Sequence, residues 1–263
     1  MAAPQPSLLP PATEKTRKIS PNLEIWVVSV VLMVATAFAG ITQTQGRAWI
    51  LVLLCMLAFM LFLGKWICGR PLGILITDRN LMSLSRFQMI LWTLLILSAY
   101  LTMVMQRIHG NISSALDIGI DGRLWALMGI STASLVGSPL LLQNKKLQDP
   151  PGSAIEKASK LLQEDQQAIQ SNREGRLYSN TSPLDARFTD IFQGDEVGNT
   201  AYIDPAKLQM FFFSLIVAAS YAYQIFHSMY NDPKNLTIPT VSEGMVALLG
   251  ISHAGYLGSK TVS

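Results

Sequence analysis

Two stretches decide the predicted fold of this chain: GISTASLVGS at residues 129–138 and GISHAGYLGS at residues 250–259. They lie 121 positions apart, and each stands near the end of an apolar run. The same offset aligns residues 124–138 with residues 245–259 without a gap, and eight of these 15 pairs are identical. Chance apolar similarity does not hold Gly and Ser residues in register over this length, so the sequence predicts an internal duplication.

The duplication extends into the apolar run that precedes each stretch. Further matches at the same offset of 121 are Arg86 with Lys207, Gln88 with Gln209, Met89 with Met210, Tyr100 with Tyr221, and Gly73 with Gly194. Each copy therefore contains two apolar runs, and both copies start on the same side of a membrane. The sequence predicts parallel hairpin repeats at residues 73–142 and 194–260, related by an axis along the membrane normal.

The composition of the chain indicates that these runs lie in a membrane. Half of the 263 residues are hydrophobic and only 14% are charged, against about 25% charged residues in soluble domains. A helix needs about 20 mostly apolar residues to cross a bilayer. Six runs approach this length, at residues 23–41, 49–66, 87–105, 124–142, 208–226 and 241–257. We expect an all-α integral membrane protein with six transmembrane helices, of which the first two form a pair at residues 23–66.

The distribution of positive charge predicts the orientation. Of the 20 Lys and Arg residues, four fall on one side of the predicted membrane, namely Arg47, Arg107, Arg123 and Lys234. The other 16 lie in the N-terminal arm, the second and fourth connections and the tail. Cytoplasmic connections carry the excess of Lys and Arg. We therefore expect cytoplasmic N- and C-termini, a cytoplasmic arm at residues 1–22, and residence in a bacterial inner (plasma) membrane.

The first apolar run has a second interpretation. It ends on Ala37, Phe38 and Ala39, and small residues after an apolar core are typical of a secretory signal cleavage site. The segment ahead of the core is long for a signal. Cleavage there would leave five spans and would not change the topology of the rest.

A polar insert at residues 143–193 separates the two predicted hairpins. Within it, the sequence SAIEKASKLLQEDQQAIQ predicts an amphipathic helix that starts with a capping box of Ser153 and Glu156. We expect the insert to be cytoplasmic and helical. The sequence leaves open whether this helix lies on the membrane, docks on the bundle or pairs with another subunit.

Small residues recur every four positions in the second helix of each hairpin. They are Gly129, Ala133 and Gly137 in one copy and Gly250, Ala254 and Gly258 in the other. Small residues let helix backbones approach closely in lipid, where the hydrophobic effect does not drive helices together. We interpret them as a helix-packing interface, formed between the two copies, with the other helix of each hairpin, or with a second copy of the protein.

Polar residues in the spans are the candidate lining of a pore or polar site. They are Ser131, Thr132, Ser252, His253, Tyr100 and Tyr221. His253 breaks the repeat because its counterpart is Thr132. An ionisable group inside a membrane is a functional hypothesis by default, but His253 lies seven positions before Lys260. A neutral hydrogen-bonding role near the interface is the competing interpretation.

A basic residue stands in the first turn of each hairpin. Arg86 and Lys207 occupy matched positions, after the predicted helix caps Ser83 and Asp204. Long basic side chains at helix ends reach toward water and anionic lipid headgroups. We therefore expect both to act as interface anchors.

The sequence contains no catalytic, metal-binding or nucleotide-binding motif that we can identify. Its two cysteines, Cys55 and Cys68, lie in or beside one apolar run and have no partner cluster. We expect a non-enzymatic protein without cofactor, metal or nucleic-acid partner. The leading hypothesis is an anchor or scaffold that works through its cytoplasmic insert, with the bilayer and a second copy or another membrane-complex subunit as partners. The alternative is a channel or passive small-solute transporter with a path at the repeat or oligomer axis.

Overall fold

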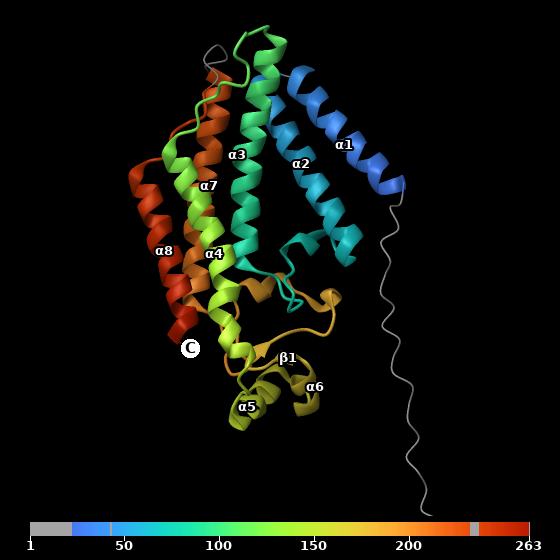
Figure 1. Ribbon diagram of the computed structural model, residues 1–263, viewed down its shortest axis with the longest axis vertical. Coiled ribbons are helices and arrows are strands. Elements are labelled where there is room, and N and C mark those ends of the chain that lie inside the picture. The colour runs from blue at the N-terminus through green and yellow to red at the C-terminus, as the bar shows by residue number, and fades with distance from the viewer. Residues whose placement is uncertain (1–22, 43, 232–236, 263) are drawn as a thin grey trace, which may run out of the picture.

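The computed structural model describes residues 23–42, 44–231 and 237–262, so the predicted arm at residues 1–22 lies outside the described residues. Six long helices run roughly along one axis and form a bundle (Figure 1). They are α1 (Leu23–Thr42), α2 (Gln45–Cys68), α3 (Leu84–His109), α4 (Gly122–Lys146), α7 (Pro205–Asn231) and α8 (Glu243–Val262).

Five of these helices are long and apolar enough to cross a membrane. Continuous apolar runs form helices in lipid because a helix satisfies its own backbone hydrogen bonds. The candidate spans are Ile25–Thr42, Gly46–Cys68, Leu84–His109, Gly122–Lys146 and Pro205–Asn231. The expected all-helical, multi-pass membrane protein is therefore confirmed at this level. Helix α8 is not among the five, since its 20 residues include Glu243, His253, Lys260 and four glycines.

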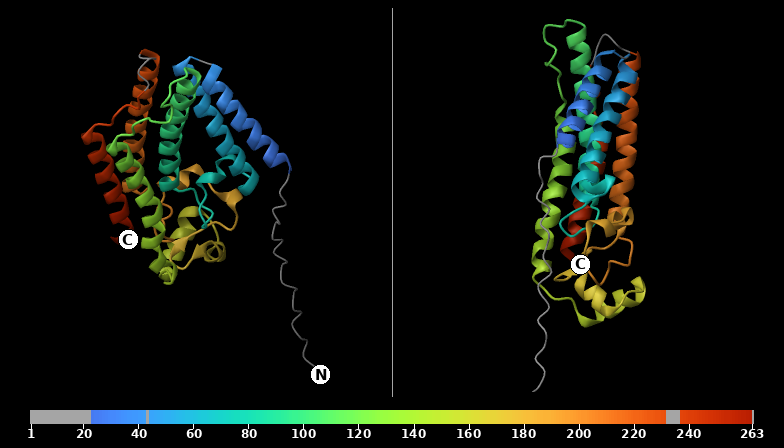
Figure 2. Two further views of the ribbon diagram at one scale, coloured as in Figure 1. Left: turned by 45° about the horizontal axis from the view of Figure 1, so that its top comes forward. Right: turned by 90° about the vertical axis from the view of Figure 1, so that its right-hand side faces the viewer.

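The core of the bundle lies between α3, α4, α7 and α8. Its largest buried side chains include Trp92 on α3 and Tyr221 on α7, whose ring centroids are 6.2 Å apart. Helices α1 and α2 pack on the α3 side of this group (Figures 1 and 2). Trp49 on α2 donates a hydrogen bond from Nε1 to Ser98 Oγ on α3 at 2.9 Å. This bond attaches the pair of α1 and α2 to the core helices.

The chain between α4 and α7, residues 147–204, forms a folded layer at one end of the bundle (Figure 1), and this whole segment is called the insert below, in place of the predicted range 143–193. It contains α5 (Gly152–Leu162), α6 (Gln166–Ser171), the strands β1 (Arg173–Glu174) and β2 (Leu177–Tyr178), and the 3-10 helices η2 (Pro183–Asp185) and η3 (Phe188–Phe192). The insert also contains a short antiparallel hairpin of β1 and β2, which the sequence did not predict. Gly175 makes its turn possible with a φ of +60°, a conformation that glycine adopts without steric cost.

The amphipathic helix predicted at residues 153–170 is divided into α5 and α6 by Gln163, which has a φ of +58°. Its start also differs from the prediction. Pro151 is the residue before α5, and Ser153 lies inside the helix without a side-chain cap, so the predicted capping box is wrong. The apolar face of α5 docks on the remainder of the insert, where Ile155 and Ala158 pack with Ile169 and Val197. The helix is therefore part of a folded unit.

A short 3-10 helix, η1 (Pro71–Leu75), leads from α2 toward α3 and packs tightly against the end of α2. The contact is between backbones, because a Cβ atom on Gly73 would lie 2.5 Å from the carbonyl oxygen of Gly64 and 2.6 Å from Cys68 Cβ. Only glycine fits at this close approach. The segment leads into the loop that carries Arg79.

Candidate functional site

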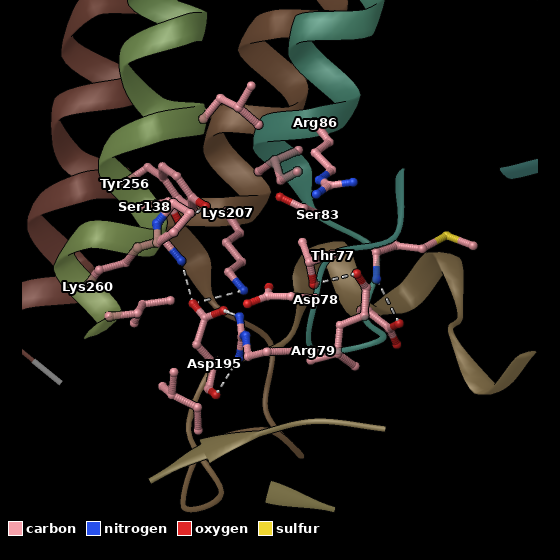
Figure 3. A pocket seen from close by; sticks show the side chains of 18 of the residues that line it. Thr77, Asp78, Arg79, Ser83, Arg86, Ser138, Asp195, Lys207, Tyr256 and Lys260 are labelled. Atoms are coloured by element: carbon pink, nitrogen blue, oxygen red, sulfur yellow. Dashed lines mark hydrogen bonds and ion pairs between the residues drawn. The ribbon is translucent and has the colours of Figure 1, made fainter. Parts of the chain in front are cut away.

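A cavity of about 840 Å³ lies where the helix bundle meets the insert (Figure 3). Its lining comes from α2, α3, α4, α7 and α8 and from the segments that precede α3 and α7. Ligand pockets in proteins usually enclose about 300–1,000 Å³. This cavity is therefore the candidate functional site.

Asp195 is the centre of the charged side of the cavity. Lys260 Nζ and Lys207 Nζ lie 2.5 Å and 3.2 Å from Asp195 Oδ2, and Arg79 Nη2 lies 2.8 Å from Oδ1. The side chains of all four residues are at most 13% exposed. One carboxylate from the insert thus connects the loop before α3, the start of α7 and the end of α8.

The environment of Asp195 keeps it ionised. Burial alone would raise the pKa of this carboxyl, but the positive charges of Lys207, Lys260 and Arg79 outweigh burial and hold the pKa well below its usual range. The three cations therefore surround a carboxylate that keeps its negative charge at neutral pH.

Local structure places each of the three cations. Arg79 also donates from Nη1 to the carbonyl oxygens of Tyr178 and Asp195, both at 3.1 Å. Lys207 stands in the first turn of α7, where the Asp204 carboxylate accepts hydrogen bonds from the backbone N–H groups of Ala206 and Lys207. The predicted cap at Asp204 is therefore confirmed, whereas Ser83 makes no side-chain cap at α3.

Lys260 enters the cavity from the last turn of α8. Its Nζ lies 4.6 Å from the ring centroid of Tyr256, a cation–π contact. The Tyr256 hydroxyl is 3.1 Å from Ser85 Oγ on α3 and 3.3 Å from Ser138 Oγ on α4. This hydroxyl network aligns the ends of three helices beside the charged cluster.

A second set of ion pairs attaches the insert to α4. Glu196 is 2.8 Å from Lys145 and 2.6 Å from Arg176, and its side chain is 8% exposed. Lys146 bridges Asp78 at 2.9 Å and Glu174 at 2.8 Å. The hydrogen bond from Lys146 lowers the pKa of the Asp78 carboxyl despite its partial burial. The last turn of α4 is therefore held on two sides by acidic groups.

Asp190 is a further acidic group in the cavity wall. Its carboxylate accepts hydrogen bonds from the backbone N–H groups of Met82 at 3.2 Å and Arg187 at 2.8 Å. Burial raises the pKa of this carboxyl, and the two hydrogen bonds oppose that rise.

The two predicted interface anchors both line the cavity. Arg86 donates from Nη1 to the carbonyl oxygen of Ile76, and Lys207 donates from Nζ to that of Gln193. Lys207 is 5% exposed. Arg86 is half-buried and forms no salt bridge with a carboxylate of the described residues. Their role as membrane-surface anchors remains a prediction.

The small-residue stripes are mostly on the outside of the bundle. Ala133, Ala254, Gly129 and Gly258 are exposed, and a Cβ atom on either of these two glycines would meet no atom within 4 Å. Gly137 and Gly250 are half-buried where α4 and α8 meet. The contact between these two helices instead uses the neighbouring serine face, on which Ser134 and Ser138 are buried.

The six candidate pore residues are distributed over different surroundings. Four are buried, namely Ser131, Ser252, His253 and Tyr221, whereas Thr132 is exposed and Tyr100 is half-buried. His253 Nδ1 lies 2.6 Å from Ser134 Oγ across the seam between α4 and α8. None of the six lines the 840 Å³ cavity or a smaller cavity of about 220 Å³ beside Asp195.

Sequence reasoning missed the centre of the cavity. Asp195 and Glu196 belong to no motif identified in the sequence, and Lys260 counted only among the 16 Lys and Arg residues on the predicted cytoplasmic side. A signal for Lys260 is present, since its counterpart in the first copy is Pro139. The replacement of Pro139 by Lys260 in the second copy gives that hairpin a charge that the first lacks.

Fold and site together define a membrane-embedded, mostly helical protein with a cation-rich cavity at one end of its bundle. Within the residues that the structure describes, no group of three or more His, Cys, Asp or Glu side chains is placed to hold a metal ion. Comparison with known proteins finds no family model, no curated protein and no solved structure that matches the chain.

Proposed function

We propose that this protein is a non-enzymatic, multi-pass membrane anchor that assembles with partners and presents its insert as a scaffold. The observation that carries the proposal is the attachment of the insert to the bundle. Glu196 and Asp195 are buried acidic groups of the insert, and both are paired with cations of the helices. Truncating one partner of a buried pair is strongly destabilising, so this attachment favours one fixed orientation of the insert.

The proposal includes six crossings, with α8 as the sixth. Helix α8 runs along α4, a candidate span, and contacts it through the pairs Ser134–His253 and Ser138–Tyr256 (Figure 1). Polar and ionisable groups of membrane helices face the bundle interior. His253 and Lys260 do so, since each is 3% exposed.

The proposal also treats α3–α4 and α7–α8 as a duplicated parallel hairpin. Similar backbone bridges, Ile76 with Met82 and Gln193 with Ile203, precede α3 and α7. In each case the matched basic residue donates to the carbonyl of the first bridge residue. Met82 and Ile203 keep the offset of 121, whereas Ile76 and Gln193 are 117 apart. The copies therefore match from the second bridge residue onward, and Gly73 and Gly194 are not equivalent.

We place the insert end of the bundle in the cytoplasm because it carries the excess of Lys and Arg, and we assign the protein to a bacterial inner membrane. The exposed small residues of α4 and α8 supply the assembly surface in this proposal, since small residues permit close helix contact in lipid.

Native mass spectrometry of the full chain in detergent tests the anchor proposal. We expect a homo-oligomer or a stoichiometric complex. The exposed side of the insert should be needed for a partner complex, so Leu161→Glu on α5, where the side chain is 48% exposed, should release the partner without unfolding the chain. A strict monomer with no bound partner would count against an anchor that assembles.

A passive pore is the second candidate, because buried polar atoms lack partners in the bundle. Within the described residues these include Gln88 Oε1, Trp92 Nε1, Ser252 Oγ and His253 Nε2. Buried polar groups are normally hydrogen-bonded to protein or to ordered water, so a hydrated path would satisfy them. Solute flux into liposomes that is lost on His253→Leu would favour the pore. Flux equal to that of empty liposomes would exclude it for that solute.

A further inference from the structure

The cavity between the bundle and the insert has more positive than negative groups. Its ionisable lining consists of five cations and three carboxyls, namely Arg79, Arg86, Lys146, Lys207 and Lys260 with Asp78, Asp190 and Asp195. The imbalance is greatest at its buried side, where three cations share Asp195. Buried charge without compensation is costly, and an anion in the cavity would compensate it.

Arg86 shows where that anion would lie. It enters the cavity from α3, and Lys207 enters from α7 (Figure 3). Arg86 has no salt bridge within the described part of the chain, and its Nη1 donates only to a backbone carbonyl. The guanidinium group carries five N–H donors in a planar fork that matches the oxygens of phosphate and carboxylate groups. Its remaining donors are available to a ligand.

The rest of the lining adds hydroxyl and apolar groups. Ser83 and Thr77 line the cavity near Arg86 (Figure 3). Apolar residues of three membrane helices complete the wall, including Met60 on α2, Met89 on α3 and Leu140 on α4. Leu140 is 62% exposed on the outside of the bundle. Basic pockets between membrane helices accommodate phosphate-bearing headgroups, and this combination of charged and apolar walls suits an anionic group that carries carbon substituents.

We propose that this cavity binds a phosphate-bearing anion whose oxygens are held by Arg86, Lys207 and Lys260. A phosphate group supplies one to two negative charges and several strong acceptors for these donors. The phosphate belongs to an anionic lipid headgroup or to a soluble phosphate compound, and the two sources share the same contacts at Arg86 and Lys207.

Thermal unfolding of the full chain in detergent, followed by tryptophan fluorescence, tests the site. The probes are inorganic phosphate against chloride at equal ionic strength, and short-chain phosphatidylglycerol against short-chain phosphatidylcholine. We expect a saturable rise of the unfolding temperature with phosphate or phosphatidylglycerol. Saturation by phosphate alone assigns a soluble compound, and saturation by phosphatidylglycerol alone assigns a lipid headgroup. The absence of a rise beyond both reference probes would overturn the proposal.

Three variants separate the site from general charge effects. Arg86→Gln should weaken the apparent affinity by about tenfold, as expected when a charge-assisted hydrogen bond is lost, whereas Arg86→Lys should retain part of it. Lys160→Gln is the matched control, because Lys160 is an exposed cation on α5 outside the cavity. Equal responses of Arg86→Gln and Lys160→Gln would contradict the assignment. If Arg86→Gln fails to fold, native mass spectrometry of the wild-type chain replaces this comparison. A phospholipid adduct of defined mass supports the site. No adduct, together with no response to phosphate, rejects the site.

Discussion

Replacing Asp195 by Asn leaves Arg79, Lys207 and Lys260 close together without a counter-charge. Breaking a buried ion pair on one side typically costs about 3–5 kcal/mol, so we expect Asp195→Asn to lower the free energy of unfolding in detergent by this order. Asp149→Asn is the control, because Asp149 pairs with Arg173 while its own side chain is 88% exposed, and exposed pairs contribute little. Equal stability of the two variants would show that Asp195 does not hold the cluster together.

The same carboxylate predicts a pH dependence. The pKa of Asp195 is held well below its usual range in the folded chain, so its stabilisation is complete above the unfolded value of about 3.9 and is lost as the pH falls through the folded value. The difference in unfolding temperature between wild type and Asp195→Asn should therefore be constant from about pH 5 to 7 and shrink below about pH 4. A difference that does not change with pH would refute this linkage.

Single residues explain why the cavity was hard to predict. Arg79 precedes Asp195 by 116 positions, and Lys260 follows it by 65. No local spacing joins them, and only the packing of helix ends brings them together. The equivalence of Arg86 and Lys207 in the two copies was predicted from the repeat, because it depends only on the constant offset of 121. The burial of Lys207 depends on the fold of the insert, which the offset does not describe.

At the scale of elements, the contact of η1 with α2 gives a sharp prediction. Gly73→Ala would place a Cβ atom 2.5 Å from the Gly64 carbonyl oxygen. Overpacking of this kind costs about 1–3 kcal/mol, so the variant should unfold more easily in denaturant. Gly122→Ala, at the start of α4, is the control, since a Cβ atom there meets nothing within 4 Å. A Gly73→Ala chain as stable as this control would mean that the close approach is not required.

Long apolar runs made the helices predictable, and the insert was only partly so. The predicted span at residues 23–41 corresponds to α1, Leu23–Thr42, because its limits are set by polar residues on both sides. The amphipathic pattern likewise predicted the helical character of α5 and α6, but not the break between them at Gln163. The strands of the insert have only two residues each, too few for an alternating pattern, and they depend on the turn at Gly175.

For the whole molecule, the exposed small residues of α4 and α8 predict self-association in the membrane. Ala133→Leu should weaken it on the order of tenfold, because a larger side chain keeps the helix backbones apart. Ala58→Leu is the matched control on the exposed side of α2. Fluorescence energy transfer between labelled copies in liposomes measures the change. Transfer that is equally strong in both variants would place the contact elsewhere.

Composition predicted the membrane environment of the whole molecule, since hydropathy reports the solvent of each helix directly. It could not predict how the helices are arranged around the serine face of α4, because Ser134 and Ser138 are as compatible with an exposed polar stripe as with a buried seam. Their partners, His253 and Tyr256, lie 119 and 118 positions further along the chain. The packing of α8 determines which face is buried.

The cluster around Asp195 also has a consequence for biosynthesis. A ribosome delivers Arg79 first, then Asp195 and Lys207, and Lys260 only with α8. Until α8 has inserted, Asp195 lacks its nearest cation, Lys260 Nζ at 2.5 Å, and the insert lacks one of its attachments to the bundle. The carboxylate thereby couples attachment of the insert to the arrival of α8.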